Sequence, residues 1–264
     1  MTTDLTYSDA SELAELIRNR EVSSVEVVQA HLDRIETTNP KVNAIVTVAD
    51  GALEAAKAAD AAVAAGVEVG PLHGVPFTAK DSFDTAGVLT QRGSPIFEGR
   101  IPDTDATSVA RLKRVGAILL AKTNLPEFSY STESDNLLTG RTNNPWNLDR
   151  TSGGSSGGES AAIAAGMSPL GLGSDLAISV RGPAAHTGIA ALKATHGRIP
   201  MTGVWPRAPA VTGTSARWPA PSATSLWPTR CCRGRTAPTV SPPFRANSTP
   251  AWACRRTGPS ASDG

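Results

Sequence analysis

Residues 151–162 read Thr-Ser-Gly-Gly-Ser-Ser-Gly-Gly-Glu-Ser-Ala-Ala, a glycine- and serine-rich loop that leads into an alanine-rich helix over 157–166. A short apolar run at 169–173 follows this helix and predicts a strand. Before the loop, the same patterns predict two further strands, at 75–80 and 117–121, with a helix at 108–115 between them. Short strands separated by helices indicate an α/β core.

The N-terminal part is expected to be mainly helical and to pack on this core. Apolar periodicity, capping serines and a buried apolar run predict four elements. They are two helices at 9–19 and 23–37, a strand at 43–48 and an alanine-rich helix at 52–65.

Composition excludes several classes of protein. The chain has 264 residues, 40% of them hydrophobic, and a formal net charge of +1. Because no basic run occurs in the first 200 residues, we expect no nucleic-acid partner. The polar N-terminus and the lack of a run of about 18 apolar residues predict a cytoplasmic location without membrane contact. Cys231, Cys232 and Cys254 have neither metal-ligand nor disulfide spacing, so no metal or cofactor is expected.

The glycine–serine loop has three interpretations. Backbone N–H groups of such a loop can hold phosphate, but both the Gly-Lys-Ser/Thr ending of a P-loop and the Rossmann glycine spacing are absent. A flexible linker does not usually lie between an apolar helix and a strand. In the third interpretation, the glycines permit close backbone approach and hold serine hydroxyls rigidly in a pocket. That arrangement is typical of a serine nucleophile.

A serine nucleophile needs a base. The four histidines lack the Gly-Xaa-Ser-Xaa-Gly elbow that would accompany a histidine triad. Lys80 is the other candidate, because it ends the apolar strand Gly74-Val-Pro-Phe-Thr-Ala-Lys-Asp81, where burial would leave some neutral amine able to accept a proton. The alternative for Lys80 is a salt bridge with the adjacent Asp81.

Ser179 lies in the segment 173–183, Gly-Ser-Asp-Leu-Ala-Ile-Ser-Val-Arg-Gly-Pro, which we interpret as a strand that ends in a turn. Four successive backbone N–H groups there could face the oxyanion that forms when an amide carbonyl is attacked. They belong to Leu176, Ala177, Ile178 and Ser179.

Four segments resemble, in order and spacing, the motifs of the amidase signature family: 74–81, Thr-Asn-Leu-Pro-Glu-Phe at 123–128, Gly-Gly-Ser-Ser-Gly-Gly at 153–158, and Ser-Val-Arg-Gly-Pro at 179–183. The resemblance runs from about residue 13 to 210. It implies an α/β/α sandwich around a mixed sheet, here incomplete at the C-terminus. It also implies hydrolysis of a small-molecule carboxamide to a carboxylate and an amine or ammonia through an acyl-enzyme. Within the family, the segments 179–183 and 195–198 also resemble those of the aryl acylamidases.

The same resemblance assigns the site residues. Ser179 is the nucleophile, Ser155 the bridging serine held by a non-proline cis bond, and Lys80 the base. Three more residues match positions that hydrogen-bond and orient this triad: Ser156, Asp175 and Arg181. An ordinary ion pair between the last two is the alternative for them.

One departure from the family bears on the substrate. Members usually have Gly-Gly before the nucleophile, where this chain has Ala177-Ile178, and Ile178 would be strained if a positive φ were needed. The alternative function is that of the glutamine-hydrolysing A subunit of a tRNA-dependent amidotransferase. It ranks second because such subunits generally keep the Gly-Gly that this chain lacks. A non-catalytic fragment is a third hypothesis, and a homo-oligomer stays open.

The composition changes near residue 210. From 211 to 264 the chain is rich in Arg, Pro, Ser and Thr, has no Lys, and shows no helix or strand period. Its Trp and Cys are unusual for a disordered tail. Back-translated and read from the third base of each codon, it yields a coherent chain that resembles the family's continuation. We therefore predict the N-terminal part of an amidase domain at 1–210 and an out-of-frame or disordered tail at 211–264.

Overall fold

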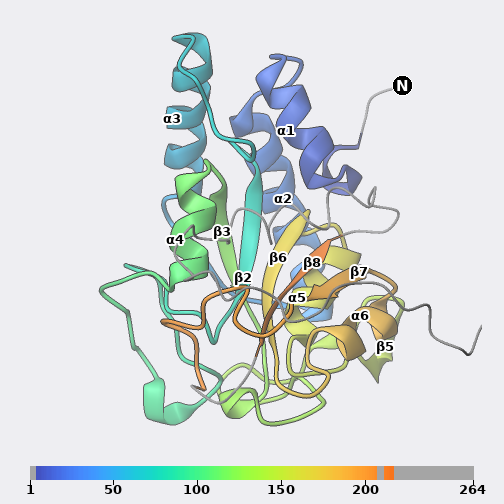
Figure 1. Ribbon diagram of the computed structural model, residues 1–264. Helices are drawn as coiled ribbons and strands as arrows, with labels where there is room; N and C mark the ends of the chain where they lie inside the picture. Colours follow the sequence, from blue (N-terminus) through green and yellow to red (C-terminus); the bar gives the residue numbers. More distant parts are fainter. Residues whose placement is uncertain (1–3, 207–210, 217–264) are drawn as a thin grey trace, which may run out of the picture. The chain divides into compact units, whose positions relative to one another are not determined.

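A six-stranded mixed sheet lies at the centre of the computed structural model, which describes residues 4–206 and the backbone of 211–216 (Figure 1). Its strand order is β1-β3-β2-β6-β8-β7. The strands are β1 (Ile45–Val48), β2 (Pro76–Lys80), β3 (Ile118–Thr123), β6 (Leu170–Asp175), β7 (Ala190–Lys193) and β8 (Val211–Ala216). β2 runs parallel to β3 and β6, and the other pairings are antiparallel. β4 (Asn143–Asn144) and β5 (Asn147–Thr151) form a separate two-stranded sheet.

Helices cover both faces of the central sheet. The helices are α1 (Ala10–Arg18), α2 (Ser24–Val42), α3 (Ala52–Ala64), α4 (Thr107–Arg114), α5 (Gly157–Ala164) and α6 (Arg181–Thr187). Short 3-10 helices occur at Leu5–Tyr7, Pro95–Phe97 and Glu127–Ser129. The predicted α/β/α sandwich around a mixed sheet is therefore confirmed for the described residues.

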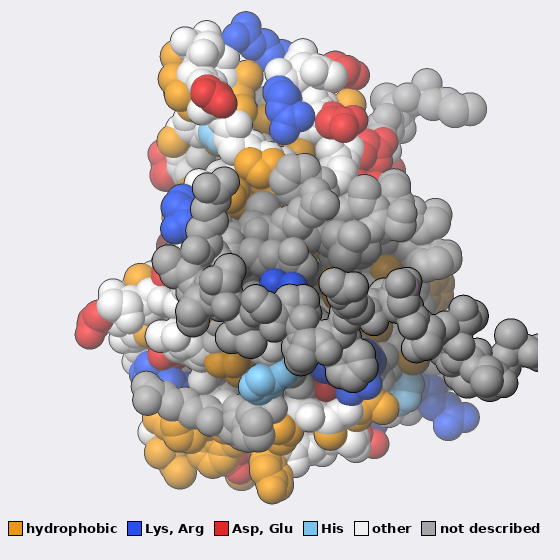
Figure 2. Space-filling view, viewed as in Figure 1, with side chains coloured by type: hydrophobic (Ala, Val, Ile, Leu, Met, Phe, Trp, Pro, Cys, Tyr) orange, Lys and Arg blue, Asp and Glu red, His pale blue; other side chains and the backbone are white. Residues whose placement is uncertain are grey.

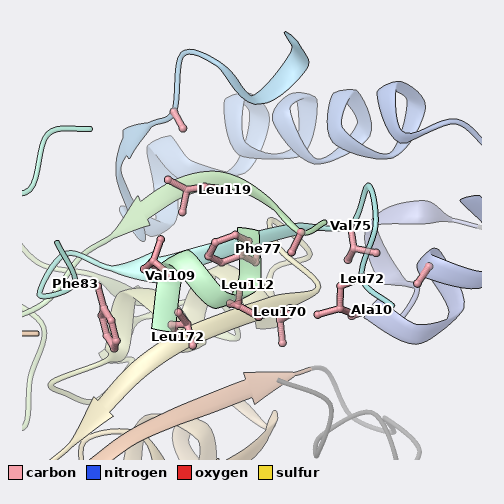
Figure 3. Close-up of a cluster of buried hydrophobic side chains, with 14 of the residues drawn as sticks. Ala10, Leu72, Val75, Phe77, Phe83, Val109, Leu112, Leu119, Leu170 and Leu172 are labelled. Atoms are coloured by element: carbon pink, nitrogen blue, oxygen red, sulfur yellow. The ribbon is translucent and has the colours of Figure 1, made fainter. Parts of the chain in front are cut away.

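Two clusters of buried apolar side chains join the layers. On one face, Phe77 of β2 and Leu172 of β6 pack with α1 and with Leu112 of α4 (Figure 3). On the other face, Leu120 of β3 packs with residues of α2, α3 and α5. All five residues of β2 are buried, as expected for a parallel strand covered on both sides. Because side chains alternate along a strand, Phe77 faces one layer and Lys80 the other.

The second helix is longer than predicted. We expected it to end at 37, but α2 continues through Pro40 to Val42. A proline inside a helix removes one backbone hydrogen bond. Here the helix ends at Asn43, which adopts a left-handed conformation (φ 54°) and donates its N–H to the Asn39 carbonyl at 2.7 Å.

The segment 173–183 also differs from its interpretation as a strand with a turn. The strand stops at Asp175, and a helix, α6, begins at Arg181. The Asp175 carboxylate explains this change, because it accepts the backbone N–H of Val180 at 3.1 Å and so folds the chain back. Sequence periodicity over so few residues could not show a bond between positions five residues apart.

The structure places β8 in the first six residues of the predicted tail, between β6 and β7. The sequence indicated no regular element after 210. The chain divides into two compact units, Met1–Arg233 and Gly234–Gly264, and every described residue belongs to the first. The rest of the predicted tail lies outside the described residues. The reading-frame hypothesis therefore stays a prediction.

Within the described ranges, no helix has the length and apolar character needed to cross a bilayer. On the face shown in Figure 2, the described Lys and Arg side chains lie among Asp and Glu and do not form one continuous basic patch.

Phe77→Ala is expected to lower the free energy of unfolding by about 3–5 kcal/mol, because it leaves a cavity in the cluster of Figure 3. Urea unfolding monitored by circular dichroism measures the change. Val67 is 58% exposed, and Val67→Ala is the matched control, with an expected change within about 0.5 kcal/mol. Equal effects of the two substitutions would contradict this packing.

Candidate active site

Lys80 lies at the end of β2 with its amine fully buried. Its Nζ donates to Ser155 Oγ at 2.6 Å and to Ser174 Oγ at 3.0 Å. Burial lowers the pKa of Lys80 to about 7, against the opposing effect of the Asp175 and Glu159 carboxylates. A sizeable neutral fraction of this amine therefore exists near neutral pH, which is what a base requires.

Ser155 is held in a tightly packed loop between β5 and α5. The Gly154–Ser155 peptide bond is cis, as the resemblance implies, and Ser155 is 1% exposed. A Cβ on Gly154 would lie 2.7 Å from the backbone of Glu133, and one on Gly157 would lie 2.6 Å from the hydroxyl of Ser134. The glycines thus allow the close backbone approach that we predicted for this loop.

Ser179 lies in the turn between β6 and α6, next to the same loop. Its carbonyl accepts the backbone N–H of Ser156 at 3.0 Å, which joins the segments that carry the two serines. Ser179 is 9% exposed, whereas Leu176 is 49% and Ile178 is 47% exposed. Lys80 and Ser155 therefore lie in the interior, and Ser179 lies where that interior meets an open apolar rim.

The three residues predicted to orient the triad lie on the segments that carry Ser155 and Ser179. Ser156 Oγ donates to the Ser174 carbonyl at 3.3 Å. Asp175 is bound by Arg181 through two hydrogen bonds of 3.0 Å, from Nε and from Nη2. Although burial acts to raise it, hydrogen bonds from Arg181 and from two backbone N–H groups hold the pKa of Asp175 below its ordinary value. The alternative of an ion pair is thus confirmed, and the role of the three residues in orienting the triad stays a prediction.

The predicted oxyanion hole comprises the backbone N–H groups of residues 176–179. Within the described part of the chain, none of these four groups donates a hydrogen bond. Neither Ala177 nor Ile178 has a positive φ, so replacement of the family's Gly-Gly causes no left-handed strain here. The role of these groups in binding an oxyanion stays a prediction.

The alternative of a salt bridge between Lys80 and Asp81 is wrong. Asp81 pairs with Lys122 of β3, with 3.3 Å between Asp81 Oδ1 and Lys122 Nζ. Lys80 Nζ is instead bonded to the hydroxyls of Ser155 and Ser174.

Sequence reasoning missed two features near the loop. Glu159 of α5 is fully buried and is not among the predicted site residues. His186 of α6 lies beside the loop, since a Cβ on Gly153 would be 3.0 Å from its Nδ1. A cavity of about 800 Å³ lies elsewhere, against α3 and the start of β3, and is not lined by Lys80, Ser155 or Ser179. We locate the candidate site by its nucleophilic and titratable groups, not by this cavity.

Comparisons with known proteins show the family of this chain. Residues 26–216 match the family model described as Amidase. The A subunit of glutamyl-tRNA(Gln) amidotransferase from Acidothermus cellulolyticus is 50% identical over 202 residues, which are 76% of this chain and 40% of that protein. The corresponding subunit from Carboxydothermus hydrogenoformans is 45% identical over 202 residues, 76% of this chain and 42% of that protein.

Solved structures are similar as well. A fatty acid amide hydrolase gives a TM-score of 0.77 at 34% identity, over 82% of this chain and 40% of its own. The peptide amidase from Stenotrophomonas maltophilia gives 0.79 at 30% identity, over 87% of this chain and 48% of its own. This chain thus spans less than half of each of these relatives. The match over residues 26–216 covers all four motifs from 74–81 to 179–183, and the chain belongs to the amidase family.

Proposed function

We propose that this chain carries the catalytic site of an enzyme that hydrolyses a carboxamide C–N bond, with Ser179 as nucleophile, Ser155 as proton carrier and Lys80 as base. The observation that carries the proposal is the 2.6 Å contact between Lys80 Nζ, buried and with a pKa of about 7, and the hydroxyl of Ser155. Membership of the amidase family supports the same reaction.

In the proposed reaction, Ser179 Oγ attacks the amide carbonyl. Its proton passes to Ser155, whose own proton passes to the neutral amine of Lys80 across their 2.6 Å contact. The C–N bond then breaks, and the leaving nitrogen takes a proton back through Ser155. Water attacks the acyl-enzyme by the same proton route, releases a carboxylate and restores Ser179.

Two substrate classes compete. The first is a small amide, including aryl or acyl amides, and the half-exposed side chains of Leu176 and Ile178 beside Ser179 suit an apolar group. The second is glutamine, hydrolysed by an amidotransferase A subunit. The curated relatives favour this second candidate, because the similar proteins from two bacteria both carry that name. A glutamine-hydrolysing subunit would also need a partner protein, whereas a simple amidase would not.

The purified chain is expected to react covalently with a fluorophosphonate probe at Ser179, as mass spectrometry of the labelled peptide would show. Ammonia release from L-glutamine and aniline release from acetanilide then separate the two substrate classes. Activity on glutamine alone would support the amidotransferase subunit. A chain with native circular dichroism and no labelling would instead support the non-catalytic fragment and overturn the proposal.

The boundary at residue 210 needs a separate experiment. Resequencing the coding DNA through the codons for residues 210 and 211 tests the predicted frame shift directly. If a one-base correction restores a longer chain, that chain is the protein to assay. If the sequence stands as printed, the frame-shift prediction fails.

A further inference from the structure

Glu159 occupies a buried site built for a carboxylate, on the face of the sheet to which Lys80 points. It is the third residue of α5, the helix that begins two residues after Ser155, and its side chain is fully buried. Its Oε1 accepts the hydroxyl of Thr78, and its Oε2 accepts the hydroxyl of Thr123 at 2.8 Å. Thr78 lies two residues before Lys80 on β2 and therefore on the same face. Thr123 lies directly opposite Lys80 in the parallel register of β2 and β3.

The third wall of this site is Gly171 on β6, the register partner of Thr78. A Cβ at Gly171 would overlap Glu159 Oε1, so any other residue there would displace the carboxylate. Three adjacent strands thus each contribute one element of the site. Together they attach the helix that follows Ser155 to the strand that carries Lys80.

The charges around Glu159 are unevenly balanced. Within the described ranges, no cation forms an ion pair with it, whereas Asp175 is neutralised by Arg181 and Asp81 by Lys122. Burial raises the pKa of Glu159 to about 7, although the two threonine hydroxyls and the charges of Lys80 and Lys122 act to lower it. Glu159 is in turn one of the two carboxylates that favour the charged form of Lys80.

We propose that Glu159 is a positioning residue that holds the Ser155 loop against β2 and whose negative charge controls how readily Lys80 gives up its proton. This inference rests on the proposed function in one respect, that Lys80 acts as a base. The placement of a carboxylate and a lysine in one buried layer of the fold does not depend on it. Glu159 does not touch the reacting atoms.

Glu159→Gln tests the charge while it keeps the shape, because an amide can accept one threonine hydroxyl and donate to the other. Loss of the negative charge lowers the pKa of Lys80, so neutral amine is present at lower pH. The rate of fluorophosphonate labelling in Glu159→Gln is expected to rise with pH about one unit earlier than in the unmodified chain. Thr123→Val, which removes one donor and favours protonated Glu159, should shift the profile in the same direction. Exposed Glu36→Gln is the control and should leave the profile unchanged.

A double-mutant cycle provides a readout that needs no activity. Urea midpoints are measured between pH 5 and 10 for the unmodified chain, Glu159→Gln, Lys80→Met and the double variant. The effect of Glu159→Gln on the midpoint is expected to differ between chains with and without Lys80→Met, and the difference should change with pH. Additive effects at every pH would overturn the proposal, whatever the labelling shows.

The two readouts separate the hypotheses. A cycle with coupling, together with a labelling rate that falls in Glu159→Gln without any shift in pH, would leave Glu159 a purely structural role and overturn its control of Lys80. If the unmodified chain is never labelled, the proposed function fails, and the cycle alone decides whether Glu159 and Lys80 are coupled.

Discussion

Ser179→Ala is expected to abolish labelling by a fluorophosphonate probe and to reduce any amide hydrolysis on the order of 10⁴-fold or more. Alanine lacks the oxygen that would attack the carbonyl, so no acyl-enzyme can form. The fold should persist, because the contact that joins this turn to the Ser155 loop uses the carbonyl of Ser179, not its side chain. Labelling is followed by in-gel fluorescence and intact mass, and folding by circular dichroism.

Ser168→Ala is the matched control for this prediction. Ser168 is buried, like Ser179, but it lies before β6 and donates its hydroxyl to the Leu170 carbonyl at 2.8 Å. Its replacement tests whether loss of a buried serine hydroxyl alone affects labelling, and we expect full labelling. Persistent labelling of Ser179→Ala at one unchanged peptide would show that another residue is the nucleophile.

Much of the fold follows from short-range patterns in the sequence. The apolar run that ends at Lys80, the alanine-rich helix after the glycine–serine loop and the alternation of strands and helices each appear close to where they were predicted. These elements are predictable because burial on both sides of a parallel sheet demands continuous apolar strands. The close approach at Gly154 and Gly157 was likewise expected, since only glycine leaves that space.

The parts that could not be predicted depend on contacts between distant residues. The start of α6 depends on the Asp175 carboxylate, and β8 depends on the edges of β6 and β7. Asp81 forms its ion pair with Lys122, 41 positions later in the sequence, and not with the adjacent Lys80. In the sequence, nothing distinguishes Glu159 from any other acidic residue of a helix, because its partners Thr78 and Thr123 lie on two distant strands. The periodicity of apolar residues indicates which side chains are buried, but it does not indicate which distant polar side chains bond to one another.

Lys80→Met is expected to reduce acylation of Ser179 by orders of magnitude without unfolding the chain. Methionine fills a similar volume in the same buried site, so the packing of β2 is kept while the proton acceptor is lost. In the unmodified chain, the labelling rate should rise as pH increases through about 7, where Lys80 loses its proton, and should then level off. Time courses of fluorophosphonate labelling at pH values between 5 and 9 measure both the rate and this rising limb of the pH–rate profile.

Lys80→Arg separates the role of a base from that of a positive charge. Arginine keeps the charge and its hydrogen-bond donors but does not lose its proton in this range. We expect it to be as unreactive as Lys80→Met, with no pH-dependent limb. The imidazole of His186 also lies beside the loop, and His186→Ala should leave the limb near pH 7 in place. Because Lys80 has a lowered pKa in the folded state, the unfolded chain binds the extra proton between pH 7 and 10.5. Stability should therefore rise with pH across this window in the unmodified chain, and Lys80→Met should make that rise smaller, with buried Lys122 supplying the remainder. A limb that moves with His186→Ala and survives Lys80→Met would transfer the role of base from lysine to histidine.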